Sequence, residues 1–127
     1  MNFDWWNKIM YVSSPRDPDP FFHPREYGKS KAEVVKAAEE VIAGLPQWKI
    51  ESYKEIQGKF SVVRWTKILP FADDINIYIV QGLDGITRVE MTGQTRVGRR
   101  DWGRNRRNIR EFLTRLDAKL SLVRSQN

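Results

Sequence analysis

The stretch DINIYIVQGLDGITRVEMTGQ, residues 74–94, decides the fold because it reads as two alternating strands joined at Asp84-Gly85, a typical hairpin turn. A pairing in which partner numbers sum to 168 separates the two faces of this hairpin. It sets Ile75, Ile77 and Ile79 opposite Gly93, Met91 and Val89 on one face, and Asp74, Asn76 and Tyr78 opposite Gln94, Thr92 and Glu90 on the other. A shift of one residue would mix apolar and polar side chains, so the pattern predicts this register.

A second hairpin is predicted upstream, where residues 48–55 and 60–68 alternate around Gln57-Gly58. In the predicted register the numbers of paired residues sum to 115, so that Ile50 lies opposite Trp65 and Ser52 lies opposite Val63. The same register sets Glu51 opposite Arg64 on the other face, which predicts a cross-strand ion pair.

Two amphipathic helices flank the predicted strands. The first opens with a capping box, Ser30 to Glu33, and ends at Gly44 and Pro46. The closing helix is expected to begin at Asp101 as its N-cap. Its apolar stripe holds Ile109, Phe112, Leu113, Leu116 and Leu120 and extrapolates back to Asn105 and Trp102.

This order of elements predicts an α+β fold, a four-stranded antiparallel sheet of two hairpins with both helices packed on one face. The 127 residues are expected to form a single domain, 1–127, with its core at 30–122. Residues 1–29 hold many aromatic residues among Pro15, Pro18, Pro20 and Pro24, which predicts an extended arm whose aromatics pack on the domain.

The composition excludes several kinds of site. With no cysteine and one histidine, the chain has no disulfides, no thiol nucleophile and no site that needs two histidines. We expect His23, in the arm, to be a surface or packing residue, and we expect no metal and no cofactor. No apolar run approaches the roughly 20 residues that span a bilayer, and no secretory signal is visible. These features predict a cytoplasmic protein.

The net charge of the chain, +6, belongs to one segment. Residues 96–115 hold eight arginines and two acidic residues, and basic and acidic residues balance elsewhere. Because the guanidinium fork suits carboxylates and phosphates, an anionic partner is the natural expectation. The candidate residues for such binding are Arg99, Arg100, Arg104, Arg107 and Arg110, of which the last three are expected on the solvent side of the closing helix.

The last third of the chain resembles a bacterial family catalogued as domain of unknown function 1499. Its members typically show Phe-x-Asp-Asp at a strand start and a later Ser-Arg-Val-Gly-x-x-Asp-x-Gly-x-Asn-x-x-x-Ile run. The matching residues are Phe71, Asp73, Asp74, Arg96, Val97, Gly98, Asp101, Gly103, Asn105 and Ile109, and Val12-Ser13-Ser14 matches an early Val-Ser-Ser. Gly93 and Thr95 stand where the family usually has serines. The resemblance implies a fold and brings no established activity.

Five polar residues of this motif are the candidates for a site: Asp73, Asp74, Arg96, Asp101 and Asn105. In the hairpin register whose partner numbers sum to 168, Asp74 lies diagonally across from Arg96, which favours an ion pair between them. Adjacent strand residues point to opposite faces, so Asp73 and Asp74 are not expected to form a catalytic dyad. The five residues either form a polar latch between the last hairpin and the closing helix or line a ligand site.

Two classes of function stay open at this point. The first is a non-enzymatic binding or structural module that recognises an acidic protein, a lipid headgroup or a small anion through the arginine-rich region. The second is an enzyme that uses the Asp, Arg and Asn residues in a cleft. Because the sequence assigns no catalytic residue, it favours the first class over the second. Non-specific nucleic-acid binding is a further alternative, although no nucleic-acid motif is present.

Overall fold

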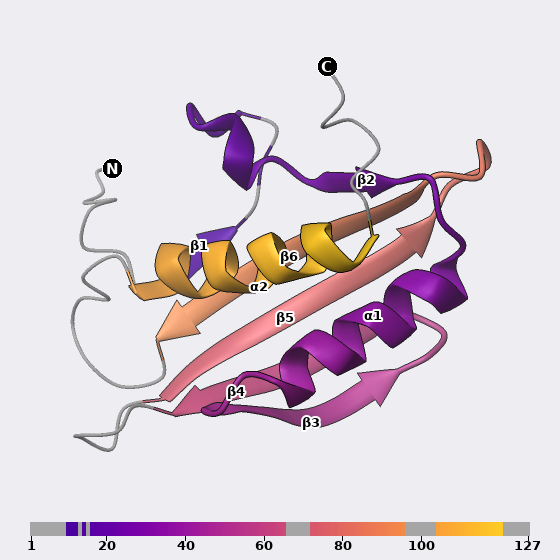
Figure 1. Ribbon diagram of the computed structural model, residues 1–127. Helices are drawn as coiled ribbons and strands as arrows, with labels where there is room; N and C mark the ends of the chain where they lie inside the picture. The colour runs from indigo at the N-terminus through magenta and orange to yellow at the C-terminus, as the bar shows by residue number, and fades with distance from the viewer. Residues whose placement is uncertain (1–9, 13, 15, 66–71, 96–103, 121–127) are drawn as a thin grey trace.

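An antiparallel sheet with two helices on one face forms the centre of the protein (Figure 1). The computed structural model describes residues 10–12, 14, 16–65, 72–95 and 104–120. In chain order the elements are β1 (Met10–Val12), the 3-10 turn η2 (Pro20–Phe22), β2 (Arg25–Tyr27), α1 (Lys31–Ala43), β3 (Trp48–Lys54), β4 (Lys59–Trp65), β5 (Ala72–Gln81), β6 (Thr87–Thr95) and α2 (Arg104–Leu120).

The sheet is larger than the sequence predicted. Its strand order is β1-β6-β5-β4-β3, so five strands rather than four lie side by side, and β2 pairs with a further part of β6. β1 pairs with residues 92–94 of β6 and β2 with residues 87–89, so both short strands lie along the same edge. Part of the predicted arm therefore belongs to the sheet. Its described prolines, Pro18, Pro20 and Pro24, lie outside these two strands, at positions where no ladder hydrogen bond is needed.

The predicted register of the β5–β6 hairpin is confirmed. Ile75 lies opposite Gly93, Ile77 opposite Met91 and Ile79 opposite Val89. All three isoleucines are completely buried. The burial of this one face explains why the alternation of side chains specifies the register.

The predicted register of the β3–β4 hairpin is wrong. Ile50 lies opposite Val62, and Arg64 lies opposite Trp48 rather than Glu51. A bulge between Ile50 and Ser52 shifts the pairing by one residue. Ile50 and Tyr53 both pack against the core although they are three residues apart, which a regular strand does not allow.

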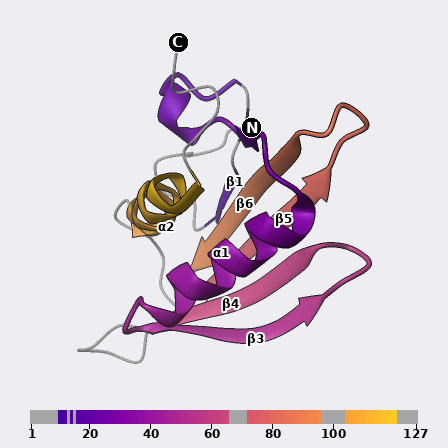
Figure 2. The same cartoon turned by 45° about the vertical axis from the view of Figure 1, so that its right-hand side comes forward.

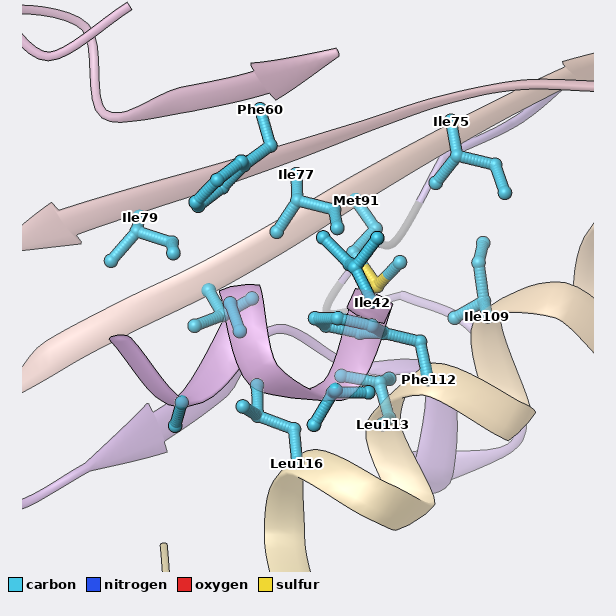
Figure 3. Close-up of a cluster of buried hydrophobic side chains, with 14 of the residues drawn as sticks. Ile42, Phe60, Ile75, Ile77, Ile79, Met91, Ile109, Phe112, Leu113 and Leu116 are labelled. Carbon is cyan, nitrogen blue, oxygen red and sulfur yellow. The ribbon is translucent and has the colours of Figure 1, made fainter. Parts of the chain in front are cut away.

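Both helices cover the same face of the sheet, as predicted (Figures 1 and 2). The capping box of α1 is confirmed, since the Glu33 N–H donates to Ser30 Oγ at 3.1 Å and the Ser30 N–H to Glu33 Oε1 at 3.0 Å. Side chains of β5 and β6 meet those of both helices in one apolar cluster (Figure 3). The predicted core residues of this cluster are all buried: Val34, Val41, Ile75, Ile77, Ile79, Val89, Met91, Phe112 and Leu116.

Candidate functional site

A buried carboxylate lies where β5 begins. The Asp73 side chain has no exposed surface, and the register places it opposite Arg64 of β4 and Thr95 of β6. Asp74, the next residue, is half-buried on the other face of the sheet, opposite Gln94. The two aspartates therefore point to opposite faces, as strand alternation predicts.

Two residues from the first turns of α2 hold the Asp73 carboxylate. Arg104 Nε donates to Asp73 Oδ2 at 2.9 Å and Arg104 Nη2 donates to Oδ1 at 2.7 Å, which is a bidentate pair. Asn108 Nδ2 donates to Oδ2 at 2.9 Å. The Arg104 side chain is 15% exposed, so the pair is largely removed from water.

Asn105 fills the space beside this ion pair. It is completely buried, as the apolar stripe of the helix predicted, and its Nδ2 lies 3.5 Å from Thr95 Oγ1. Gly93 faces it, and a Cβ at that position would lie 2.8 Å from Asn105 Oδ1. The missing side chain at Gly93 therefore lets α2 approach β6 closely. The polar latch that the structure describes differs from the predicted one in its members. From here on the name refers to this group only: Asp73, Thr95, Arg104, Asn105 and Asn108.

The structure places Asp73 and Asn105 in the polar latch, each with its own partners, and it gives Arg104 a role that was not predicted. That residue was expected on the solvent side of the closing helix; instead it points to the sheet and binds Asp73. Asn108 was not among the predicted site residues. A signal was present, because Arg104 and Asn108 precede Phe112, Leu116 and Leu120 in steps of four, which places all five on one side of a helix.

Several predicted site residues lie outside the described part of the chain. These are Arg96, Arg99, Arg100 and Asp101, together with Phe71 and the glycines Gly98 and Gly103 of the motif. The expected pairing of Asp74 with Arg96, and the expected N-cap at Asp101, therefore stay predictions.

The arm lies over other arginines of α2. Arg106 Nη1 donates to Asp17 Oδ2 at 2.9 Å, and its guanidinium lies 3.8 Å from the centre of the Phe22 ring. Arg110 Nη2 lies 3.8 Å from Asp19 Oδ2, and its guanidinium stacks over Phe21 at 4.8 Å. Charge and cation–π contacts thus fix η2 on the helix.

A second buried ion pair fixes β2 to the end of α2. Arg25 is 2% exposed and binds both carboxylate oxygens of Asp117, with Nε at 3.1 and 3.2 Å and Nη2 at 3.0 Å. The Tyr27 hydroxyl donates to Asp117 Oδ1 at 2.7 Å. Burial, reinforced by this hydrogen bond to a carboxylate, holds the pKa of Tyr27 far above its usual range. Nothing in the sequence pattern indicated this cluster.

The remaining described arginines of α2 face solvent. Arg107 and Arg115 are exposed, and the Arg110 side chain is 54% exposed despite its contacts with the arm. Glu111 is the acidic residue that lies among them on the exposed side. Arg107 and Arg115 are eight positions apart, which corresponds to roughly 12 Å of helix, so the charges are spread along one extended strip.

These observations define an α+β protein in which a basic helix is held on a sheet by the polar latch and by the arm. In comparison with known families, the chain matches one described as a protein of unknown function, DUF1499, over residues 6–116, and it belongs to that family. A comparison with curated proteins found no match. Among the described residues, neither helix has the length and hydropathy needed to cross a membrane.

Proposed function

We propose that this protein is a non-enzymatic binding module that recognises an anionic partner through the exposed arginines of α2. The observation that carries the proposal is the strip of Arg107, Arg110 and Arg115, which is exposed and includes one carboxylate, Glu111. Arg99 and Arg100 lie shortly before the helix in the sequence, outside the described residues, and stay candidates for the same binding.

The different surroundings of the arginines of α2 support this proposal. Arg104 and Arg106 bind Asp73 and Asp17, so the fold accounts for their presence. Arg115 is exposed at the surface, where a lysine would serve solubility equally well. An arginine fork is suited to bidentate binding of carboxylate or phosphate oxygens.

The hydrogen bonds and the burial of Asp73 in the polar latch argue against the alternative of an enzyme with a catalytic cleft. Both oxygens of Asp73 accept hydrogen bonds from Arg104 and Asn108, and the carboxylate has no exposed surface. A substrate would have to displace these partners to reach it. The latch is better explained as the link between the hairpin and the helix.

The proposal is tested with the variant Arg107→Gln/Arg115→Gln. Its binding is compared with that of the wild type for poly-L-glutamate, inorganic phosphate, phosphatidylserine vesicles and DNA, each at two salt concentrations. We expect at least one carboxylate or phosphate probe to bind the wild type in a salt-dependent manner and to bind the variant about tenfold more weakly, because two charge-assisted hydrogen bonds are lost.

A matched control removes the same charge elsewhere. Lys36 and Lys49 are exposed on α1 and β3, so Lys36→Gln/Lys49→Gln should bind as the wild type does. Equal weakening by both variants would mean that net charge alone matters and would overturn the proposal. Binding of DNA alone, with a salt slope that falls by about one unit per lost phosphate contact, would replace the proposal with non-specific nucleic-acid binding.

A further inference from the structure

Large exposed apolar side chains gather at one end of the sheet. Among the described residues they are Ile56, Val80 and Leu83, with Ile56 98% and Leu83 109% exposed, whereas Trp65 lies at the opposite end of β4. Ile56 lies in the turn between β3 and β4, and Leu83 lies in the turn between β5 and β6. Lys59 of β4 pairs with Tyr78 of β5, so both turns lie at the same end (Figure 2).

The two turns have the same construction. The Gly58 N–H donates to the Glu55 carbonyl at 3.1 Å, and the Gly85 N–H donates to the Gly82 carbonyl at 3.3 Å. Each turn ends in a glycine with positive φ, 63° at Gly58 and 80° at Gly85. The second residue of each turn, Ile56 or Leu83, is aliphatic and almost fully exposed, although such positions usually carry polar residues.

Hydrogen bonds hold both tips in place. The Ile79 N–H donates to the Gly58 carbonyl at 2.7 Å, which ties the first turn to β5. The Ile86 N–H donates to Asp84 Oδ1 at 3.0 Å and closes the second turn. Ile56 and Leu83 are therefore presented outward by ordered backbone rather than exposed by a loose loop.

Positive charges lie directly behind the first tip. Lys54 pairs with Lys59 across the hairpin, and two like charges in this position repel each other. Lys31 of α1 joins them, since its Nζ donates to the Glu55 carbonyl at 3.3 Å. The exposed carboxylates Glu55 and Asp84 lie in the same turns, so the three ammonium groups outnumber them at this end of the sheet. A small excess of positive charge beside exposed aliphatic tips fits a surface that is apolar at depth and anionic above.

We propose that this end of the sheet docks on an anionic lipid bilayer, with Ile56 and Leu83 entering the interface and Lys54 and Lys59 contacting the headgroup phosphates. Two apolar tips alone give weak, reversible binding, and lysines at an anionic surface add to it. The surface lies on a different part of the fold from the arginine strip of α2, so this inference is independent of the proposed function.

The test is co-sedimentation with phosphatidylcholine vesicles, with and without phosphatidylserine. The wild type should bind the vesicles that contain phosphatidylserine. Ile56→Ser/Leu83→Ser should weaken binding by about tenfold or more, because the variant lacks the two aliphatic side chains that would enter the bilayer interface. Lys54→Gln/Lys59→Gln should weaken binding by about fivefold per lysine at low salt.

Two controls make the result specific. Trp65→Ser removes an exposed apolar residue from the opposite end of β4 and should leave vesicle binding unchanged. Arg107→Gln/Arg115→Gln should reduce it much less than the tip variant does. Urea midpoints establish that each variant is folded, which is expected for the fully exposed tips.

Three outcomes would overturn the docking proposal. They are the absence of vesicle binding, full binding by the tip variant, and equal binding to vesicles with and without phosphatidylserine. Loss of self-association in the tip variant without any vesicle binding would assign the tips to a protein contact instead. Loss of vesicle binding in the arginine variant alone would refute docking at the tips and leave the function proposed for α2 standing.

Discussion

Asp73 carries a charge in a place where water does not reach. Its carboxylate is stabilised by the Arg104 guanidinium and the Asn108 amide, both of which come from α2. Charged groups in such surroundings contribute little net stability as a pair, but removing one partner leaves the other without compensation. The latch therefore makes the attachment of α2 sensitive to single substitutions.

We predict that Asp73→Asn lowers the free energy of unfolding by about 3 kcal/mol, because the Arg104 charge then lacks its counter-ion. Glu26→Gln is the comparison. It breaks the pair of Glu26 with Arg88, in which both side chains are 42% exposed, and should cost less than about 1 kcal/mol. Urea denaturation of both variants gives the two values. Equal small losses would show that the latch does not hold the helix.

At the scale of single residues, sequence reasoning succeeded where periodicity carries the information. It placed Asp73 and Asp74 on opposite faces and turned Asn105 inward. It failed for Arg104, because an arginine in a charged run was assigned to the surface. Whether a guanidinium faces solvent depends on a partner 31 residues away, which periodicity does not reveal.

At the scale of elements, the two hairpins show what alternation can and cannot specify. The β5–β6 hairpin has a regular ladder, so its side-chain pattern fixes the pairing. In the β3–β4 hairpin Lys54 pairs with Lys59, so the turn holds four residues, 55–58, instead of the two expected, and the partner numbers sum to 113 rather than 115. The bulge between Ile50 and Ser52 then shifts the pairing by one further residue and leaves no distinct sequence signal. The strands β1 and β2 were missed because three residues are too few to show alternation.

The capping box of α1 predicts a dependence of stability on pH. The Glu33 carboxylate accepts the Ser30 backbone N–H, and this hydrogen bond, followed by the bond with the Ser30 side chain, lowers the pKa of Glu33. A lowered pKa means that the ionised form stabilises the folded state. This contribution is present above the ordinary pKa of glutamate and is lost as the pH falls through the lowered value.

The measurement compares urea midpoints of the wild type and Glu33→Gln at neutral and acidic pH. Glutamine keeps an acceptor for the Ser30 N–H but has no charge to lose, so the advantage of the wild type should shrink on acidification. Glu39→Gln, in the middle of the exposed side of α1, controls for general charge effects. A difference between wild type and Glu33→Gln that is constant with pH would contradict this role of Glu33.

At the scale of the whole molecule, the arginines of α2 are divided between internal and external contacts. Arg104 binds the sheet through Asp73, and Arg106 binds the arm through Asp17. Arg107 and Arg115 face solvent. Some of these arginines thus attach the helix to the rest of the fold, and we propose that the exposed ones bind an anionic partner.

The most direct test of this division is the urea midpoint measured with and without poly-L-glutamate. A ligand that binds only the folded state raises the midpoint by linkage. We predict that Arg104→Gln lowers the midpoint measured without the probe but keeps the rise in midpoint when the probe is added. Arg107→Gln/Arg115→Gln should lower the midpoint less than Arg104→Gln does and should lose the rise. The same response from both variants, or no rise in the wild type, would contradict this division.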